Sequence, residues 1–264
     1  MYKIGWFSSG RGSGSRELLT TMYNSITSSD VKAEISFVFC NRERGFSDET
    51  DQFLDLVESY QIPLVCYSSV VFRNQLPADQ MDNWRILYDR EVMKRLENFH
   101  VDLSVLAGYM LVIGPEMCTR YTMINLHPAE PGGPKGTWRE VIWELIENRA
   151  THTGVMMHLA TPELDEGPPV TFCSFTIKGD PFDIHWSRLE RESLQSIRER
   201  EGNDFELFKQ IRQHGLMREF PLIVTTVKAF SEERVKIQDG TVTDANGTPI
   251  NGYDLSSEID RAVK

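Results

Sequence analysis

The chain has 264 residues, of which 40% are hydrophobic and 25% charged, and its formal net charge is -11. This length suits one large α/β domain or two small ones. The negative charge opposes non-specific contact with nucleic acid, and no apolar run approaches the length of a membrane span or a secretory signal. The cysteines lack CxxC spacing and predict buried free thiols in a reducing compartment; they are Cys40, Cys66, Cys118 and Cys173. We therefore expect a cytoplasmic protein without nucleic-acid or membrane partners.

Short apolar runs alternate with longer amphipathic segments along the first two thirds of the chain. Strands are expected within 3–9, 32–40, 63–69, 101–110, 122–127, 154–160 and 170–177. Helices are expected at 15–26, 48–60, 84–99 and 137–148, and later at about 186–214 and 221–230. The pattern predicts a Rossmann-like α/β fold with a mostly parallel central sheet flanked by helices, C-terminal helices and a small terminal hairpin. We expect one domain at 1–232, with an extension at 233–264 that packs on it or frays from it.

A glycine-rich loop follows the first expected strand and leads into a helix. It contains Gly10, Arg11, Gly12, Ser13 and Gly14. Glycines let backbone N–H groups approach an anion, and the helix dipole favours negative charge there. The spacing does not match a dinucleotide fingerprint or a P-loop. The loop is therefore either a phosphate site or a tight turn.

The stretch INLHP places an amide and an imidazole two residues apart at the end of an expected strand. This spacing puts Asn125 and His127 on one face of the strand. At the carboxyl end of a parallel strand, that face borders the crevice where α/β proteins bind ligands. An amide can donate to an oxyanion, and an imidazole can transfer protons near neutral pH. The alternative is a capping asparagine beside a structural histidine.

An acidic loop follows the sixth expected strand. Its Asp165 could orient His127 through a carboxylate contact, or the loop could be a solvated turn. His158, which precedes the loop, either faces the same crevice or is a buried core histidine. The histidines and cysteines show no metal-ligand spacing, so no metal is expected.

Taken in order, these pieces resemble the folate-dependent formyltransferases, most closely the branch that formylates phosphoribosylglycinamide in purine synthesis. The matching stretches are SSGRGSG, YDREV, LAGYMLVIGPEMCTRY, INLHP, GVMMHLATPELDEGP and FPLIV. The resemblance implies formyl transfer from 10-formyltetrahydrofolate, a cosubstrate, to a phosphorylated small-molecule amine. It assigns catalysis to Asn125 as oxyanion donor, to protonated His127, and to Asp165 with an ordered water.

The resemblance also implies two binding regions. Folate would contact Leu106, Tyr109, Met110, Leu111, Val112, Ile113, His158, Ala160, Thr161 and Glu163. The acceptor would contact Gly10, Arg11, Gly12, Ser13, Gly14, Gly108 and Pro128.

Two departures leave the acceptor open. Gly14 stands where the glycinamide enzymes usually have asparagine, and Leu216 stands where they have a glutamate that holds the amine; His214 or Glu219 could replace the latter in another register. A tRNA acceptor is disfavoured because residues 201–264 carry eight Lys/Arg and eleven Asp/Glu, a net of -3. The alternatives are an amino-sugar nucleotide acceptor, formyltetrahydrofolate hydrolysis, and a non-catalytic folate- or phosphate-binding relative. A nicotinamide oxidoreductase would rest on the glycine loop alone. The sequence leaves the oligomeric state open, a homodimer included.

Overall fold

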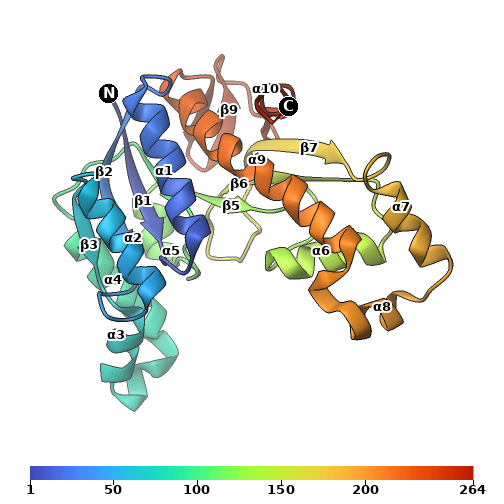
Figure 1. Cartoon of the computed structure of the whole chain (residues 1–264). Coiled ribbons are helices and arrows are strands. Elements are labelled where there is room, and N and C mark those ends of the chain that lie inside the picture. The colour runs from blue at the N-terminus through green and yellow to red at the C-terminus, as the bar shows by residue number, and fades with distance from the viewer. Residues whose placement is uncertain (264) are drawn as a thin grey trace.

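A central sheet organises the molecule (Figure 1). The structure is a computed structural model and describes residues 1–263. Within these residues the strands of the sheet follow the order β10-β7-β6-β5-β4-β1-β2-β3. They are β1 (Tyr2–Ser8), β2 (Ala33–Cys40), β3 (Leu64–Cys66), β4 (Leu103–Leu106), β5 (Met123–His127), β6 (His152–Leu159), β7 (Pro169–Thr176) and β10 (Tyr253–Asp254). A separate hairpin consists of β8 (Val235–Gln238) and β9 (Thr241–Asp244). The predicted mostly parallel sheet and the small hairpin are confirmed.

Helices cover both faces of the sheet. The α-helices are α1 (Ser13–Thr27), α2 (Asp48–Ser59), α3 (Ser69–Gln75), α4 (Trp84–Arg95), α5 (Pro115–Arg120), α6 (Trp138–Glu147), α7 (Asp183–Trp186), α8 (Leu194–Glu201), α9 (Glu206–Ser231) and α10 (Ser256–Ala262). Short 3₁₀ turns are η1 (Ala78–Asn83), η2 (Ser187–Glu190) and η3 (Gly202–Asp204). No helix in residues 1–263 combines the length and apolar character needed to cross a bilayer.

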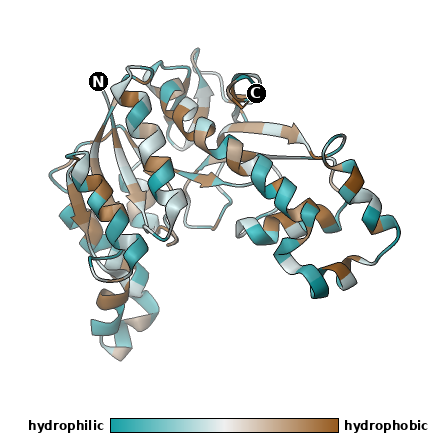
Figure 2. Ribbon diagram, in the orientation of Figure 1, coloured by the Kyte–Doolittle hydropathy of each residue, from teal (hydrophilic) through white to brown (hydrophobic). Residues whose placement is uncertain are grey.

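The apolar pattern explains the layers. Parallel strands are buried on both faces, and all four residues of β4 are buried accordingly. One face packs against α1 and α9, and the other against α4 and α5. Figure 2 shows brown along the central strands and teal on much of the outer helix surface. A further hydrophobic cluster joins α6, α7 and α8 to the first half of α9, and these helices form the lobe on the right of Figure 1.

The direction of the strands changes at β6. The chain runs parallel through β3, β2, β1, β4 and β5, and then β6 pairs antiparallel with β5 and β7 antiparallel with β6. The carboxyl ends of β1, β4 and β5 therefore meet at one edge of the sheet, which we call the catalytic edge.

The C-terminal segment packs along the lateral edge of the sheet, beside β7. Tyr253 and Asp254 extend the sheet beside β7, and Ile259 of α10 is fully buried. Ser256 Oγ also accepts a hydrogen bond of 3.0 Å from the N–H of Ser174. The segment covers an edge that would otherwise expose unpaired backbone groups.

Candidate active site

Asn125 and His127 lie on one face at the end of β5. The antiparallel β6 places His158 directly opposite Asn125 in the register, so these two side chains also share a face. Asn125 Nδ2 lies 3.1 Å from His158 Nε2, and the other ring nitrogen, Nδ1, lies 3.0 Å from the carbonyl oxygen of Leu159. His127 and His158 are each 2% exposed, and their ring centroids are 6.0 Å apart. The strands thus hold two buried imidazoles and an amide together.

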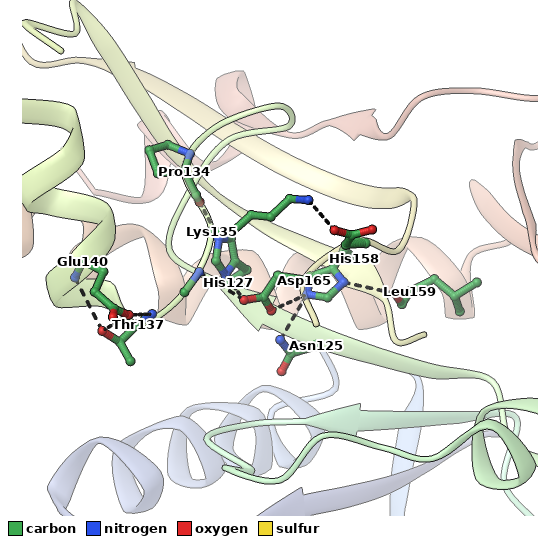
Figure 3. Close-up of polar contacts among 11 residues, drawn as sticks. Asn125, His127, Pro134, Lys135, Thr137, Glu140, His158, Leu159 and Asp165 are labelled. Carbon is green, nitrogen blue, oxygen red and sulfur yellow. Dashed lines mark hydrogen bonds and ion pairs between the residues drawn. The ribbon is translucent and has the colours of Figure 1, made fainter. Parts of the chain in front are cut away.

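Asp165 reaches these groups from the loop between β6 and β7. Its carboxylate lies 3.6 Å from His127 Nδ1 and 3.5 Å from His158 Nε2, and it accepts a hydrogen bond of 3.3 Å from the N–H of Gly136 (Figure 3). The side chain of Asp165 is only 7% exposed. One carboxylate therefore contacts both imidazoles.

The backbone of this loop depends on a close approach to β6. A Cβ atom on Gly167 would lie 1.7 Å from the carbonyl oxygen of Leu159, so the chain passes there only as glycine. Asp165 itself adopts a φ of 54°, a left-handed conformation that Asp and Asn tolerate better than most residues. The backbone path of this turn therefore points the Asp165 carboxylate toward His127 and His158.

The loop after β5 closes over His127. The Pro134 carbonyl oxygen lies 2.9 Å from His127 Nε2 and can only accept, so this ring nitrogen carries the proton. Thr137 caps α6 in a capping box with Glu140. This cap fixes the segment that contains Gly136, the donor to Asp165. The glycine- and proline-rich stretch AEPGGPKGTW after β5 is thus part of the site.

Burial decides the charge state of the site. It lowers the pKa of His127, and the Pro134 carbonyl and the Asp165 carboxylate oppose this only in part. Burial acts to raise the pKa of Asp165, but the contacts with His158 and His127 and the N–H of Gly136 outweigh it and hold the pKa below its usual value. At neutral pH the resting site therefore pairs an ionised carboxylate with a neutral His127. Burial opposes the protonated ring that the resemblance implied, whereas the Pro134 carbonyl at Nε2 and the Asp165 carboxylate at Nδ1 favour it.

The glycine loop lies at the same catalytic edge. The N–H of Ser9 donates to the Gly108 carbonyl at 3.1 Å, and the N–H of Met110 donates to Ser9 Oγ at 2.9 Å. These bonds join the loop after β1 to the loop after β4. Gly10 has a φ of 54° and packs on Phe53, so a side chain would be strained there. The N-terminus of α1 consequently opens onto the edge that carries His127.

Arg42 lies near this loop, which itself contains Arg11. Arg42 Nη1 donates to Thr50 Oγ1 at 3.4 Å, and that hydroxyl donates to the Gly10 carbonyl at 3.1 Å. Burial is the main cause that lowers the pKa of Arg42, and the positive charge of Arg11 is the second. The contribution of Arg11 places a second positive charge near Arg42 beside the loop. Arg42 did not stand out in the sequence.

The residues that the resemblance assigns to folate divide into two groups. Most of the apolar ones are buried in the cluster against α4 and α5, namely Leu106, Tyr109, Ile113 and Ala160. Met110 is 55% exposed, Leu111, Val112 and Thr161 are half-buried, and Glu163 is exposed. Leu164, which the resemblance did not single out, is 60% exposed. Met110 and Leu164 thus expose apolar side chains to solvent, and the buried residues form a packed layer against α4 and α5.

Helix α9 contributes the residues near the departure at Leu216. Leu216 and His214 are both half-buried, and His214 packs against Phe182 of the right-hand lobe's cluster, with ring centroids 4.9 Å apart. Glu219 is 8% exposed and pairs with Arg212, and its charge raises the pKa of His127. Of His214 and Glu219, the two residues that could replace the missing glutamate, Glu219 is therefore the one whose charge reaches His127.

Comparison with known proteins identifies the family. A model of the formyl transferase family matches residues 10–180, which is more than half of the chain. Phosphoribosylglycinamide formyltransferase of Haemophilus influenzae is 26% identical over 256 residues and spans 96% of this chain and 99% of the relative. The structure resembles phosphoribosylglycinamide formyltransferase of Coxiella burnetii, with a TM-score of 0.68, 19% identity and coverage of 96% and 98% of the two chains. It also resembles a formyltetrahydrofolate deformylase of Pseudomonas syringae, with a TM-score of 0.62, 18% identity and coverage of 92% and 65%. The chain belongs to the formyl transferase family.

Proposed function

We propose that the protein transfers the formyl group of 10-formyltetrahydrofolate to the amine of phosphoribosylglycinamide. The convergence of Asn125, His127 and Asp165 at the catalytic edge carries this proposal. The names of the curated relatives support the acceptor. Free thiols at all four cysteines support a reducing compartment, the cytoplasm, as the location.

The amine nitrogen attacks the formyl carbon, and the carbonyl oxygen becomes an oxyanion. Asn125 donates an N–H to this oxygen. The neutral His127 and the ionised Asp165 take the proton that the amine loses, and the carboxylate stabilises the imidazolium that forms. The bond from the formyl carbon to N10 then breaks, and N10 receives the proton. The products are the formylated amine and tetrahydrofolate.

The donor occupies the catalytic edge between the segment Leu106–Ile113 and the loop from Ala160 to Asp165. Met110 and Leu164 offer exposed apolar surface to its rings. Buried Tyr109 and Ile113 act through packing beneath this surface.

The acceptor's phosphate binds at the N-terminus of α1, where no side chain caps the first-turn N–H groups, those of Ser13 and Gly14 among them. Arg11 supplies additional positive charge there, and Pro128 follows His127 directly in the chain. The departure at Gly14 leaves room, because an added Cβ would meet no atom within 4 Å.

The departure at Leu216 favours a second candidate, a different amine acceptor. A half-buried leucine offers no charge to an amine, and the carboxylate of Glu219 is already paired with Arg212. An amino-sugar nucleotide would also place phosphate and amine in one molecule.

The test mixes purified protein with 10-formyltetrahydrofolate and follows tetrahydrofolate by absorbance, with and without phosphoribosylglycinamide. Release that requires this amine, together with the mass of its formylated product, supports the proposal. Release without any amine indicates hydrolysis. Release only with an amino-sugar nucleotide assigns the second candidate, and failure with every amine despite donor binding indicates a binding protein.

A further inference from the structure

We propose that His158 is a positioning residue, which fixes the orientation of the Asn125 amide so that one N–H faces the reacting oxygen. This inference rests on the proposed formyl transfer and extends it to a residue that the sequence resemblance had assigned to folate.

The tautomer of His158 follows from its neighbours. A carbonyl oxygen only accepts, so the 3.0 Å contact with Leu159 requires a proton on Nδ1. A neutral imidazole has a single N–H, and Nε2 therefore presents a lone pair. Asn125 Nδ2 lies 3.1 Å from that lone pair and donates to it. This hydrogen bond therefore fixes which way the amide points, with Nδ2 toward His158 and Oδ1 away from it.

The alternative partner of His158 Nε2 is the Asp165 carboxylate, at 3.5 Å, and donation to it would favour the ionised carboxylate. Donation to that carboxylate would require protons on both ring nitrogens, and Asn125 would then have to present its oxygen to the ring. The shorter contact is the one with the amide nitrogen, which favours the neutral ring.

The ring is held at both ends and buried, with 2% of its surface exposed. Asn125 is half-buried and is therefore the more accessible of the two to a substrate. Rotation of the amide by half a turn would set Asn125 Oδ1 against the Nε2 lone pair, which is repulsive. The donated bond thus keeps Oδ1 off His158 and leaves the second N–H of Nδ2 free for the oxyanion.

Preorganised donors are worth more than donors that must reorient during the reaction. Loss of an oxyanion donor costs roughly 100- to 1000-fold in kcat, so loss of its orientation is expected to cost about 10- to 100-fold. His158→Leu removes the acceptor at similar volume, and His158→Gln restores an oxygen that can accept from Asn125. We expect His158→Leu to lower kcat with little change in KM, and His158→Gln to recover much of the loss.

Double-mutant cycles identify the group through which His158 acts. In an Asn125→Ala background, His158→Leu should cost nothing further, whereas in an Asp165→Asn background it should cost its full factor. Equal losses in all backgrounds would overturn the proposal in favour of a general structural role. A loss that vanishes only with Asp165→Asn would also overturn it, because His158 would then act through the carboxylate. If His158→Leu does not fold, His158→Ala, which also removes the acceptor, serves in the same cycles.

A measurement without turnover separates this proposal from the proposed reaction. Nitrogen-15 NMR should show one slowly exchanging proton on the Asn125 side chain in the wild type, and fast exchange of both protons in His158→Leu. Fast exchange in the wild type would refute the positioning role whatever the enzyme's activity. Slow exchange without any formyl transfer would retain the contact and reject the reaction.

Discussion

Asp165→Asn removes the negative charge that faces His127 while keeping the shape of the side chain. Asparagine also tolerates the left-handed backbone at this position, where φ is 54°. The loop is therefore expected to keep its path, and the carbonyl oxygen of the new amide can still accept from the N–H of Gly136. The substitution tests charge rather than folding.

The magnitude follows from the separation of the two groups. A unit charge 3.6 Å from His127 Nδ1 stabilises the imidazolium by about 1 to 5 kcal/mol for effective dielectric constants between about 80 and 20. The pKa of His127 should therefore fall by a further 1 to 3 units or so in the variant. Because burial already lowers this pKa, the ring would take the amine's proton poorly, and we expect kcat to fall by roughly 100-fold or more.

Two assays check this prediction. Proton NMR of the His127 ring, titrated between about pH 4 and pH 9 around the reference imidazole value, measures the pKa, and tetrahydrofolate release measures turnover. Glu166→Gln is the matched control, because it removes the adjacent acid, which is exposed and paired with Lys135. We expect it to behave like the wild type. An unchanged His127 pKa in Asp165→Asn, or equal turnover in both variants, would refute the reasoning.

Three further predictions follow. Gly167→Ala should displace the acidic loop, because its Cβ would lie 1.7 Å from the Leu159 carbonyl, and turnover should fall well below that of Gly215→Ala, whose Cβ meets no atom within 4 Å. Leu216→Glu should raise kcat/KM for phosphoribosylglycinamide if another amine is the native acceptor. If the wild type already uses phosphoribosylglycinamide efficiently and the variant leaves kcat/KM unchanged, Leu216 does not mark the amine site. Asp89→Asn should stabilise the protein at neutral pH, because burial raises the pKa of Asp89 from 3.8 to about 6. The ionised wild type loses stability as pH rises through that interval, by at most about 3 kcal/mol; denaturant unfolding should show the variant more stable at pH 7.5 and equal to the wild type near pH 4, and a constant difference would contradict this.

The sequence predicted those parts of the site that depend on local spacing. Asn125 and His127 are two residues apart on a strand, so their shared face follows from the strand period alone. Apolar runs likewise predicted strands β1 to β7 and the helices α1, α2, α4 and α6. The boundary between a domain at 1–232 and an extension at 233–264 stays a prediction.

Other parts depend on contacts that no local pattern carries. His158 lies opposite Asn125 only because β6 runs antiparallel, and the sequence does not give that direction. The charge of Glu219 reaches His127 from a helix far along the chain. Tyr109, assigned to folate by resemblance, lies 6% exposed in a hydrophobic cluster, since apolar residues near a site serve equally well as walls or as core. The Pro134 carbonyl, in an irregular loop that carries no periodic pattern, supplies a contact to the catalytic ring.

The most direct measurement compares the wild type with His127→Ala for formation of tetrahydrofolate and formylated phosphoribosylglycinamide. The account predicts equimolar amounts of both products from the wild type and almost none from a variant that remains folded by circular dichroism. Wild-type rates in His127→Ala, or tetrahydrofolate formed without any formylated amine, would contradict it.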